Sequence, residues 1–311
     1  MEYDQMIEWL LAGDVSIQYQ VQRDLLGKEL PELQNRIQTE GWGKRFLEAR
    51  NPNGHWSRGF YQVKWISSHY TLLDLKQLNI APTPPEVSET IAIILGENKS
   101  GDGGINPSSH IQQSDVCING MFLNYACYFK TPQADLCSIV DFIISQQMPD
   151  GGFNCESTRY NPVHSSLHTT LSILEGLQEY AAKGYDYRRI ELDRVVASGR
   201  EFILRHRLYL SDRTGEIINK RFLMLSYPSR WFYDILRALE YFRAAGVAYD
   251  ERMGPALDVL IKKRRGDGTW PVQAKHSGQV HFDMEKTGQP SRWNTLRALR
   301  VLNHFEQLLV V

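Results

Sequence analysis

The chain has 311 residues, a formal net charge of −1 and 42% hydrophobic residues. A charge this close to zero gives no support for binding nucleic acid or an anionic membrane surface, and the length allows a sizeable core. No run approaches the 18 apolar residues of a membrane-spanning helix, and the acidic residues 1–4 lack the order of a secretory signal. Because the four cysteines are few for this length, we expect a reduced, cytoplasmic setting.

Helical periodicity dominates the chain, and strand-like alternation is scarce. Leu167, Leu171, Leu174 and Leu177, for example, recur on one face of a helix. Prolines at 31, 84–85 and 132 suit first helical turns, where the missing amide hydrogen costs little. In chain order the sequence predicts helices near 3–12, 15–27, 31–49, 67–79, 85–97, 115–129, 132–147, 164–182, 188–207, 230–245, 250–264 and 292–309.

A glycine-containing turn recurs along the chain with a helix behind it. The first glycines of successive turns are separated by 49, 48, 64 and 53 residues. A period of this size marks an array in which one supersecondary unit is copied. The turns are Asn53–Trp56, Asp102–Ile105, Asp150–Phe153, Thr214–Ile217 and Asp267–Trp270.

Each helix after a turn pairs naturally with the helix before the next turn, and six such pairs can close into a ring. We therefore predict an all-α (α/α)6 toroid, with residues 1–311 as a single domain. The more aromatic helices that follow the turns are expected to form the inner ring. The polar segments 213–227 and 271–289 are expected to be loops over one mouth of the ring. The repeat helices are predicted to begin near residues 15, 67, 115, 164, 230 and 292.

Aligning the inner helices by their leucines places a column of side chains at their N-terminal ends. Equivalent positions in a ring converge on one end of the cavity. Aromatic residues at this end could line a lipid-sized apolar cavity, although aromatic residues of inner helices are also ordinary core. The column consists of His69, Cys117, His168, Tyr233 and Trp293, and Tyr70, Phe122, His164, Trp231, Asp234 and Arg292 are further candidates to face the cavity.

Three of these positions suggest a metal site. Asp115, Cys117 and His168 offer a carboxylate, a thiolate and an imidazole, which suit tetrahedral zinc with one open coordination position. Residues i and i+2 point apart in a continuous helix, so Asp115 and Cys117 can share an ion only where a helix begins. The alternative is an N-cap aspartate, a buried cysteine and a helix-start histidine that touch no metal. Candidates for a fourth ligand or a supporting contact are His69, Cys155 and His164.

The turns and helix starts resemble the protein prenyltransferase β-subunit and squalene cyclase superfamily over roughly residues 50–305. Gly151–Phe153 and Gly268–Trp270 match the Gly-Gly-Phe and Gly-x-Trp turns of that superfamily. In its prenyltransferase branch, an Asp-x-Cys motif follows a Gly-Gly turn and the next repeat contributes a His-Thr helix start. Asp115, Cys117 and His168 occur in that register. The resemblance therefore implies a zinc ion that activates a cysteine thiol of the substrate.

The chain departs from this superfamily where a prenyl diphosphate would bind. Ser109, Gln112 and Ile118 stand where the family has basic residues and a tyrosine, and they supply little of the charge that an anionic diphosphate needs. The Asp-x-Asp-Asp acid motif of the cyclase branch is absent from the sequence. The family's prenyltransferases also use a separate helical subunit, so a helical partner is a further possibility. Substitutes for the missing cations could be Arg58, Lys64, His110 and Lys220.

Three functions are compatible with these features. The leading hypothesis is a prenyltransferase-like, zinc-dependent transferase that acts on a hydrophobic small molecule or a peptide thiol in the central cavity. The first alternative is a non-catalytic toroid that binds a ligand or a protein. The second is a carbohydrate-active (α/α)6 enzyme, for which Asp115 and Asp234 are the carboxylate pair at inner helix starts.

Overall fold

The structure is a computed structural model, and it describes residues 1–108, 113–158 and 160–306. Ser109, His110 and Gln112 lie outside the described residues.

The described chain is helical, with one short β-ribbon formed by Trp270–Pro271 (β1) and Pro290–Ser291 (β2). Its α-helices are α1 Tyr3–Leu11, α2 Val15–Asp24, α3 Pro31–Arg36, α4 Gly41–Glu48, α5 Ser68–Gln77, α6 Pro85–Asn98, α7 Val116–Tyr128, α8 Gln133–Ser145, α9 Leu167–Ala182, α10 Arg189–Arg205, α11 Ile235–Ala244, α12 Gly254–Lys262 and α13 Arg292–His304. Short 3₁₀-helices are η1 Lys64–Ile66, η2 Cys155–Thr158, η3 Lys220–Leu223 and η4 Glu251–Met253.

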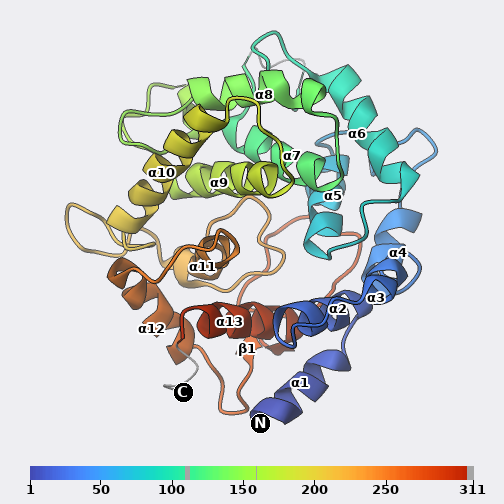
Figure 1. Cartoon of the computed structure of the whole chain (residues 1–311), viewed down its shortest axis with the longest axis vertical. Coiled ribbons are helices and arrows are strands. Elements are labelled where there is room, and N and C mark those ends of the chain that lie inside the picture. Colours follow the sequence, from blue (N-terminus) through green and yellow to red (C-terminus); the bar gives the residue numbers. More distant parts are fainter. Residues whose placement is uncertain (109–112, 159, 307–311) are drawn as a thin grey trace.

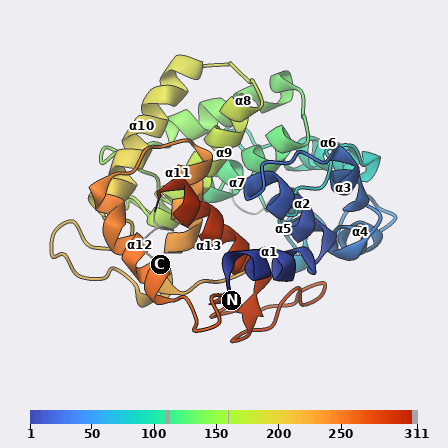
Figure 2. The same ribbon diagram turned by 60° about the horizontal axis from the view of Figure 1, so that its bottom comes forward.

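The helices form the predicted all-α toroid of two concentric rings (Figure 1). The inner ring consists of α2, α5, α7, α9, α11 and α13, and α1, α3, α4, α6, α8, α10 and α12 lie outside it. Contacts between α13 and α2 close the inner ring. Figure 2 shows α1 beside α13, where the Arg292 guanidinium donates a hydrogen bond to the Trp9 carbonyl oxygen at 2.9 Å. Among the described residues, no helix is both long and apolar enough to cross a bilayer.

The inner helix α9 has two faces of different character. On α9, Leu171 and Leu174 are completely buried. His168, Ser172 and Glu175 recur between them at helical spacing and occupy another face of the same helix. Leucine columns of this kind form the core, while the intervening polar side chains are available to the inside of the ring.

Two of the recurring turns hold the start of the following inner helix through their aspartates. Asp102 accepts hydrogen bonds from its own turn and from the Ser114 amide at 2.7 Å, directly before α7. Asp150 repeats the arrangement with the Ser165 amide at 2.8 Å, directly before α9. These two equivalent bonds fix the starts of α7 and α9.

Two inner helices approach each other much more closely than side chains would allow. A Cβ atom on Gly176 of α9 would lie 2.3 Å from the Gly120 carbonyl oxygen of α7, and a Cβ on Gly120 would lie 2.6 Å from the Ser172 oxygen. Only glycine permits this backbone contact. The N-terminal ends of α7 and α9, which carry the predicted metal ligands, are therefore held next to each other.

The helix predicted over 31–49 is broken into α3 and α4. Gly41 has a φ of +59°, and a Cβ atom there would lie 2.1 Å from the Asp14 carboxylate. That carboxylate accepts a hydrogen bond from the Trp42 amide at 2.9 Å and satisfies a donor at the start of α4. The helix predicted from residue 230 begins only at Ile235, because Arg230 has a φ of +58°.

Candidate functional site

The N-terminal ends of the inner helices are covered by the two long connecting segments, as the sequence predicts. The Trp65 indole, just before α5, donates a hydrogen bond to the Ser277 oxygen at 2.6 Å. On the opposite side, the His168 ring at the start of α9 contacts Phe222 with centroids 5.2 Å apart. We call this region the aromatic end; it comprises Trp65, Tyr70, His168, Phe222, Trp231, Phe232 and His276.

His168 lies within a group of aromatic rings. Its ring centroid is 5.1 Å from that of Trp231, and Phe232 is also in contact. Burial, reinforced by the charges of Arg237 and His276, lowers the pKa of His168 to about 4. The Tyr233 amide donates a hydrogen bond to Nδ1 at 2.7 Å. A neutral imidazole that accepts at Nδ1 carries its proton on Nε2, so His168 presents an N–H to its surroundings.

The structure brings Cys117 together with Cys155, which the sequence marks only as an additional candidate. The Cys117 amide donates to the Cys155 sulfur at 2.9 Å, and the Cys155 amide donates to the Thr169 hydroxyl at 3.2 Å. Cys155 therefore bridges the starts of α7 and α9. The hydrogen bond to Cys155, together with burial, raises the pKa of the Cys117 thiol. Burial opposes ionisation of Cys155, but hydrogen bonds from Cys117 and Thr169 lower its pKa.

The predicted zinc ligands do not form a metal site in this arrangement. Within the three described ranges, no three His, Cys, Asp or Glu side chains are grouped so that they could hold a metal ion. Asp115 and Cys117 do lie at the start of α7, as the motif requires. His168, however, uses its Nδ1 lone pair on the Tyr233 amide, and its Nε2 proton would have to leave before zinc could bind there. The donor set therefore does not fit zinc as the side chains lie.

The α5 and α7 wall of the aromatic end is tightly packed. His69 is completely buried, and burial lowers its pKa to about 3. Its Nδ1 lies 3.3 Å from the Tyr125 hydroxyl, while Nε2 has no hydrogen-bond partner among the described residues. Tyr70 and Phe122 are also fully buried, and the Tyr70 hydroxyl lies 3.1 Å from that of Tyr61. These predicted cavity residues pack as core.

A stack of rings forms the other wall. Trp231 and His276 both stack on Phe232, each with centroids 3.9 Å apart. The indole nitrogen of Trp231 and Nε2 of His276 have no partner among the described residues. The Tyr233 hydroxyl donates to the Leu208 oxygen at 2.6 Å, and the Asp234 carboxylate caps α11 by accepting from the Arg237 amide at 2.8 Å. Asp234 is therefore engaged in capping.

Three other predicted cavity residues lie elsewhere. His164 is exposed in the segment before α9. Arg292 turns toward the outer wall, with its guanidinium 4.7 Å from the centre of the Trp9 ring, because it is the first residue of α13 and faces α1. Trp293 lies deeper in the ring and is 2% exposed, with its indole stacked on Tyr227 at 4.9 Å.

The ring also encloses a cavity that the sequence does not predict. It has a volume of about 560 Å³ and is lined mainly by the C-terminal halves of the inner helices. We call it the lumen cavity. Its lining is charged, whereas the sequence predicts an apolar inner ring, because the leucines face the core and the charges face the lumen. The spacing of Arg237, Glu240 and Arg243 is the signal that could have identified this face. Neither Asp115 nor Asp234 is among its lining residues.

No family model and no curated protein matches this chain. A solved structure of the type II terpene cyclase MstE from Scytonema with the product merosterolic acid A has a TM-score of 0.46 and 13% identity, covering 94% of this chain and 87% of that chain. Another, with the substrate geranylgeranyl dihydroxybenzoate, has a TM-score of 0.47 and 12% identity, covering 95% and 88%. The helices of this chain themselves form the all-α toroid that the sequence resemblance implies.

Proposed function

We propose that this toroid is an enzyme that acts on a hydrophobic small molecule at the aromatic end, with the Cys155 thiol as its reactive group and Cys117 as the residue that holds it. The observation that carries the proposal is the placement of two cysteines where two inner helices begin. The Cys155 sulfur lies 2.9 Å from the Cys117 amide nitrogen and is joined through Thr169 to the helix that carries His168.

The surrounding rings suit an apolar substrate. Aromatic side chains supply large apolar contact surfaces, and the stack of Trp231, Phe232 and His276 lies beside His168. A buried ring nitrogen without a partner is costly to leave unsatisfied. His69, Trp231 and His276 each have such a nitrogen within the described part of the chain. A substrate with one polar group on an apolar body could use these nitrogens.

Because the sequence resembles enzymes that act on prenyl compounds, a prenyl alcohol is a suitable probe, and we choose farnesol for the binding test. Trp231 at the aromatic end and Trp9 on the outer wall are both half-buried, so they form a matched pair. We expect W231A to weaken farnesol binding about tenfold in calorimetric titration, because a stacked aromatic surface is lost. W9A should bind as the wild type does. Equal affinities for both variants would contradict a site at the aromatic end.

Catalysis is tested separately from binding. The purified protein is incubated with farnesol and glutathione. The product sought by mass spectrometry is the thioether in which the glutathione sulfur replaces the farnesol hydroxyl group, with release of water. Products that disappear in C155A and persist in C137A would support the enzyme, because Cys137 lies on the outer helix α8 and donates to its own helix at Gln133. Farnesol binding without any product would leave the non-catalytic toroid in place of the enzyme.

Zinc binding stays a prediction of the sequence, and it is independent of the farnesol test. It requires His168 to release the Tyr233 amide so that a ring lone pair becomes available. One equivalent of zinc in the wild type, lost in C117A and retained in C137A, would support the predicted ligand set. A zinc-free wild-type protein, purified without chelators and after growth with added zinc, would exclude it.

A further inference from the structure

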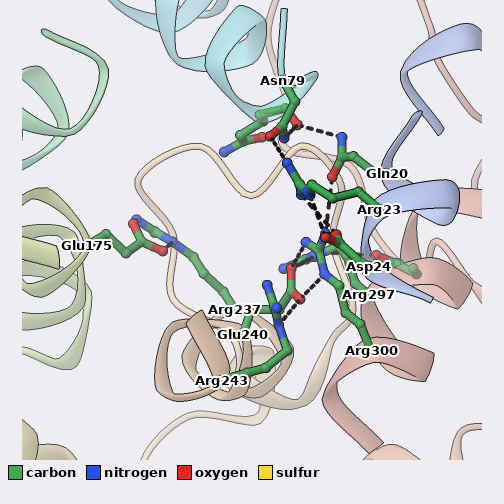
Figure 3. A network of polar contacts seen from close by, with 12 residues as sticks. Gln20, Arg23, Asp24, Asn79, Glu175, Arg237, Glu240, Arg243, Arg297 and Arg300 are labelled. Carbon is green, nitrogen blue, oxygen red and sulfur yellow. Dashed lines mark hydrogen bonds and ion pairs between the residues drawn. The ribbon is translucent and has the colours of Figure 1, made fainter. Parts of the chain in front are cut away.

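The lumen cavity contains more cationic than anionic side chains. Asp24 and Glu240 are shared by the guanidinium groups of Arg23, Arg243 and Arg300, and Arg297 binds Glu240 as well (Figure 3). Four arginines therefore share two carboxylates. The C-terminal ends of α2 and α11 lie here and offset part of the excess, since each helix end carries roughly half a negative charge.

Arg243 is the least well paired of these arginines. Its Nε lies 3.6 Å from the Glu240 carboxylate, whereas Arg23 and Arg297 approach their carboxylates to 2.6 and 3.1 Å. Nε of Arg243 has no hydrogen-bond partner among the described residues, although its side chain is only 23% exposed. Burial, and then the like charge of Arg300, lower the pKa of Arg243. Arg243 therefore shares the Glu240 carboxylate only at a distance and has room for a hydrogen-bonded anion of its own.

Unpartnered polar atoms of other residues occur around the same cavity. The indole nitrogen of Trp293 and the side-chain oxygens of Gln77 and Asn124 have no hydrogen-bond partner in the described part of the chain, and all three residues line the cavity. Trp293 is 2% exposed. Leaving buried polar groups unsatisfied costs free energy. The cavity therefore offers two donors, from Arg243 and Trp293, and two acceptors, from the amides.

We propose that the lumen cavity is a binding site for a small organic oxyanion, a molecule that carries carboxylate or phosphate groups. The anion would bind Arg243, whose planar guanidinium can donate two parallel hydrogen bonds to such a group. The Trp293 indole would donate a further bond, and Gln77 and Asn124 would accept from hydroxyl groups of the ligand. The volume of about 560 Å³ lies within the usual range for small-molecule sites. This site is separate from the aromatic end and does not depend on the function proposed there.

The test measures binding of citrate, inorganic phosphate and pyrophosphate to the whole protein by calorimetry. Sodium chloride of matched ionic strength controls for screening of the charged lining. We expect saturable binding of at least one of the three anions and none of chloride. Preference for citrate would identify a carboxylate ligand, and preference for either phosphate compound would identify a phosphate ligand. No saturable binding of any of the three would overturn the proposal.

Variants locate the site. R243Q removes the charge and should weaken binding about tenfold or more, because a charged hydrogen bond is lost. R189Q is the matched control, since Arg189 lies on the outer helix α10, where it pairs with Asp193 and is 46% exposed. W293F keeps the ring, removes only the indole donor and should weaken binding severalfold. Thermal unfolding and circular dichroism verify that each variant is folded. Equal affinity of wild type, R243Q and W293F would overturn the assignment to the lumen cavity.

Discussion

Arg300, on the last inner helix, is hydrogen-bonded to Asp24 on the first, with Nη1 2.9 Å from the carboxylate oxygen. The two residues are 276 positions apart in the chain. The same guanidinium also binds Glu240 on α11 and the Gln20 amide oxygen on α2. One side chain therefore joins three of the six inner helices at the seam where the toroid closes.

Removal of this arginine should open the seam. R300M keeps most of the side-chain volume but leaves Asp24 and Glu240 with fewer partners in a partly buried place, with exposures of 9% and 14%. Breaking a buried ion pair on one side costs about 3–5 kcal/mol, and we expect a loss at the lower end of that range because other arginines remain. Urea unfolding measures it. R265Q, at an exposed pair with Asp267, should change stability by less than about 1 kcal/mol.

The two carboxylates that the arginines share, Asp24 and Glu240, should make the protein sensitive to strong acid. Burial opposes their ionisation, but the hydrogen bond from Arg23 and the charge of Arg300 lower the pKa of Asp24 to about 2. The charge and hydrogen bond of Arg300 outweigh burial likewise and lower the pKa of Glu240 to about 2. A carboxylate whose pKa is lower in the folded state stabilises the fold fully at pH values above its unfolded-state pKa, near 4. It loses that contribution as the pH falls toward its folded-state pKa, near 2.

The measurement is the free energy of unfolding in urea at several pH values. We expect a loss of about 2–3 kcal/mol per carboxylate between about pH 4.5 and 2, and the two sites are coupled through Arg300. D24N removes one of the two titrations and should make the decline shallower. An unchanged pH profile in D24N would show that this ion pair contributes nothing to acid stability.

Sequence periodicity was sufficient to predict the fold and most of the helix bounds. Copied turns and leucine spacings are local features, and in two of the repeats the turn aspartate, Asp102 or Asp150, also bonds to the next helix start. The break at Gly41 was missed because it depends on the Asp14 carboxylate, which lies far away in the sequence. Tertiary contacts of this kind leave no local pattern.

The sequence predicts where the candidate residues lie in the repeats, but it does not predict their bonding. Convergence of Cys117 and His168 on one end follows from equal places in the repeats. That Cys155 lies against Cys117 depends on the path of the chain after a turn, and that His168 accepts from Tyr233 depends on the start of α11. The lumen cavity was missed because its cations and carboxylates come from several helices, and each one alone resembles a solvated helix face.

Close contact of α7 and α9 gives a sharp steric prediction. G176A places a Cβ atom 2.3 Å from the Gly120 oxygen, so the helices must move apart. Overpacking of this kind costs about 1–3 kcal/mol, measured by urea unfolding. The matched control is G96A on α6, where nothing lies within 4 Å of the added Cβ, and this variant should be more stable by about 0.5–1 kcal/mol. A stability of G176A equal to that of G96A would contradict the close approach of the helices.

Stability should also depend on pH in a milder range, through buried histidine. Burial lowers the pKa of His69 to about 3, so the folded protein keeps this ring neutral where an unfolded chain would protonate it near pH 6.5. The unfolded state then binds the extra proton between those values. The contribution of neutral His69 to the free energy of unfolding is therefore fully present above pH 6.5. It declines as the pH falls, by about 1.4 kcal/mol per pH unit for one such histidine.

H69F keeps a ring of similar size in contact with Phe60 and Tyr125 and removes the titration. Urea unfolding of the wild type and H69F between pH 7 and 5 should give a steeper decline for the wild type. Parallel curves would mean that His69 is accessible to protons in the folded protein, and the ring would then not be part of a closed core.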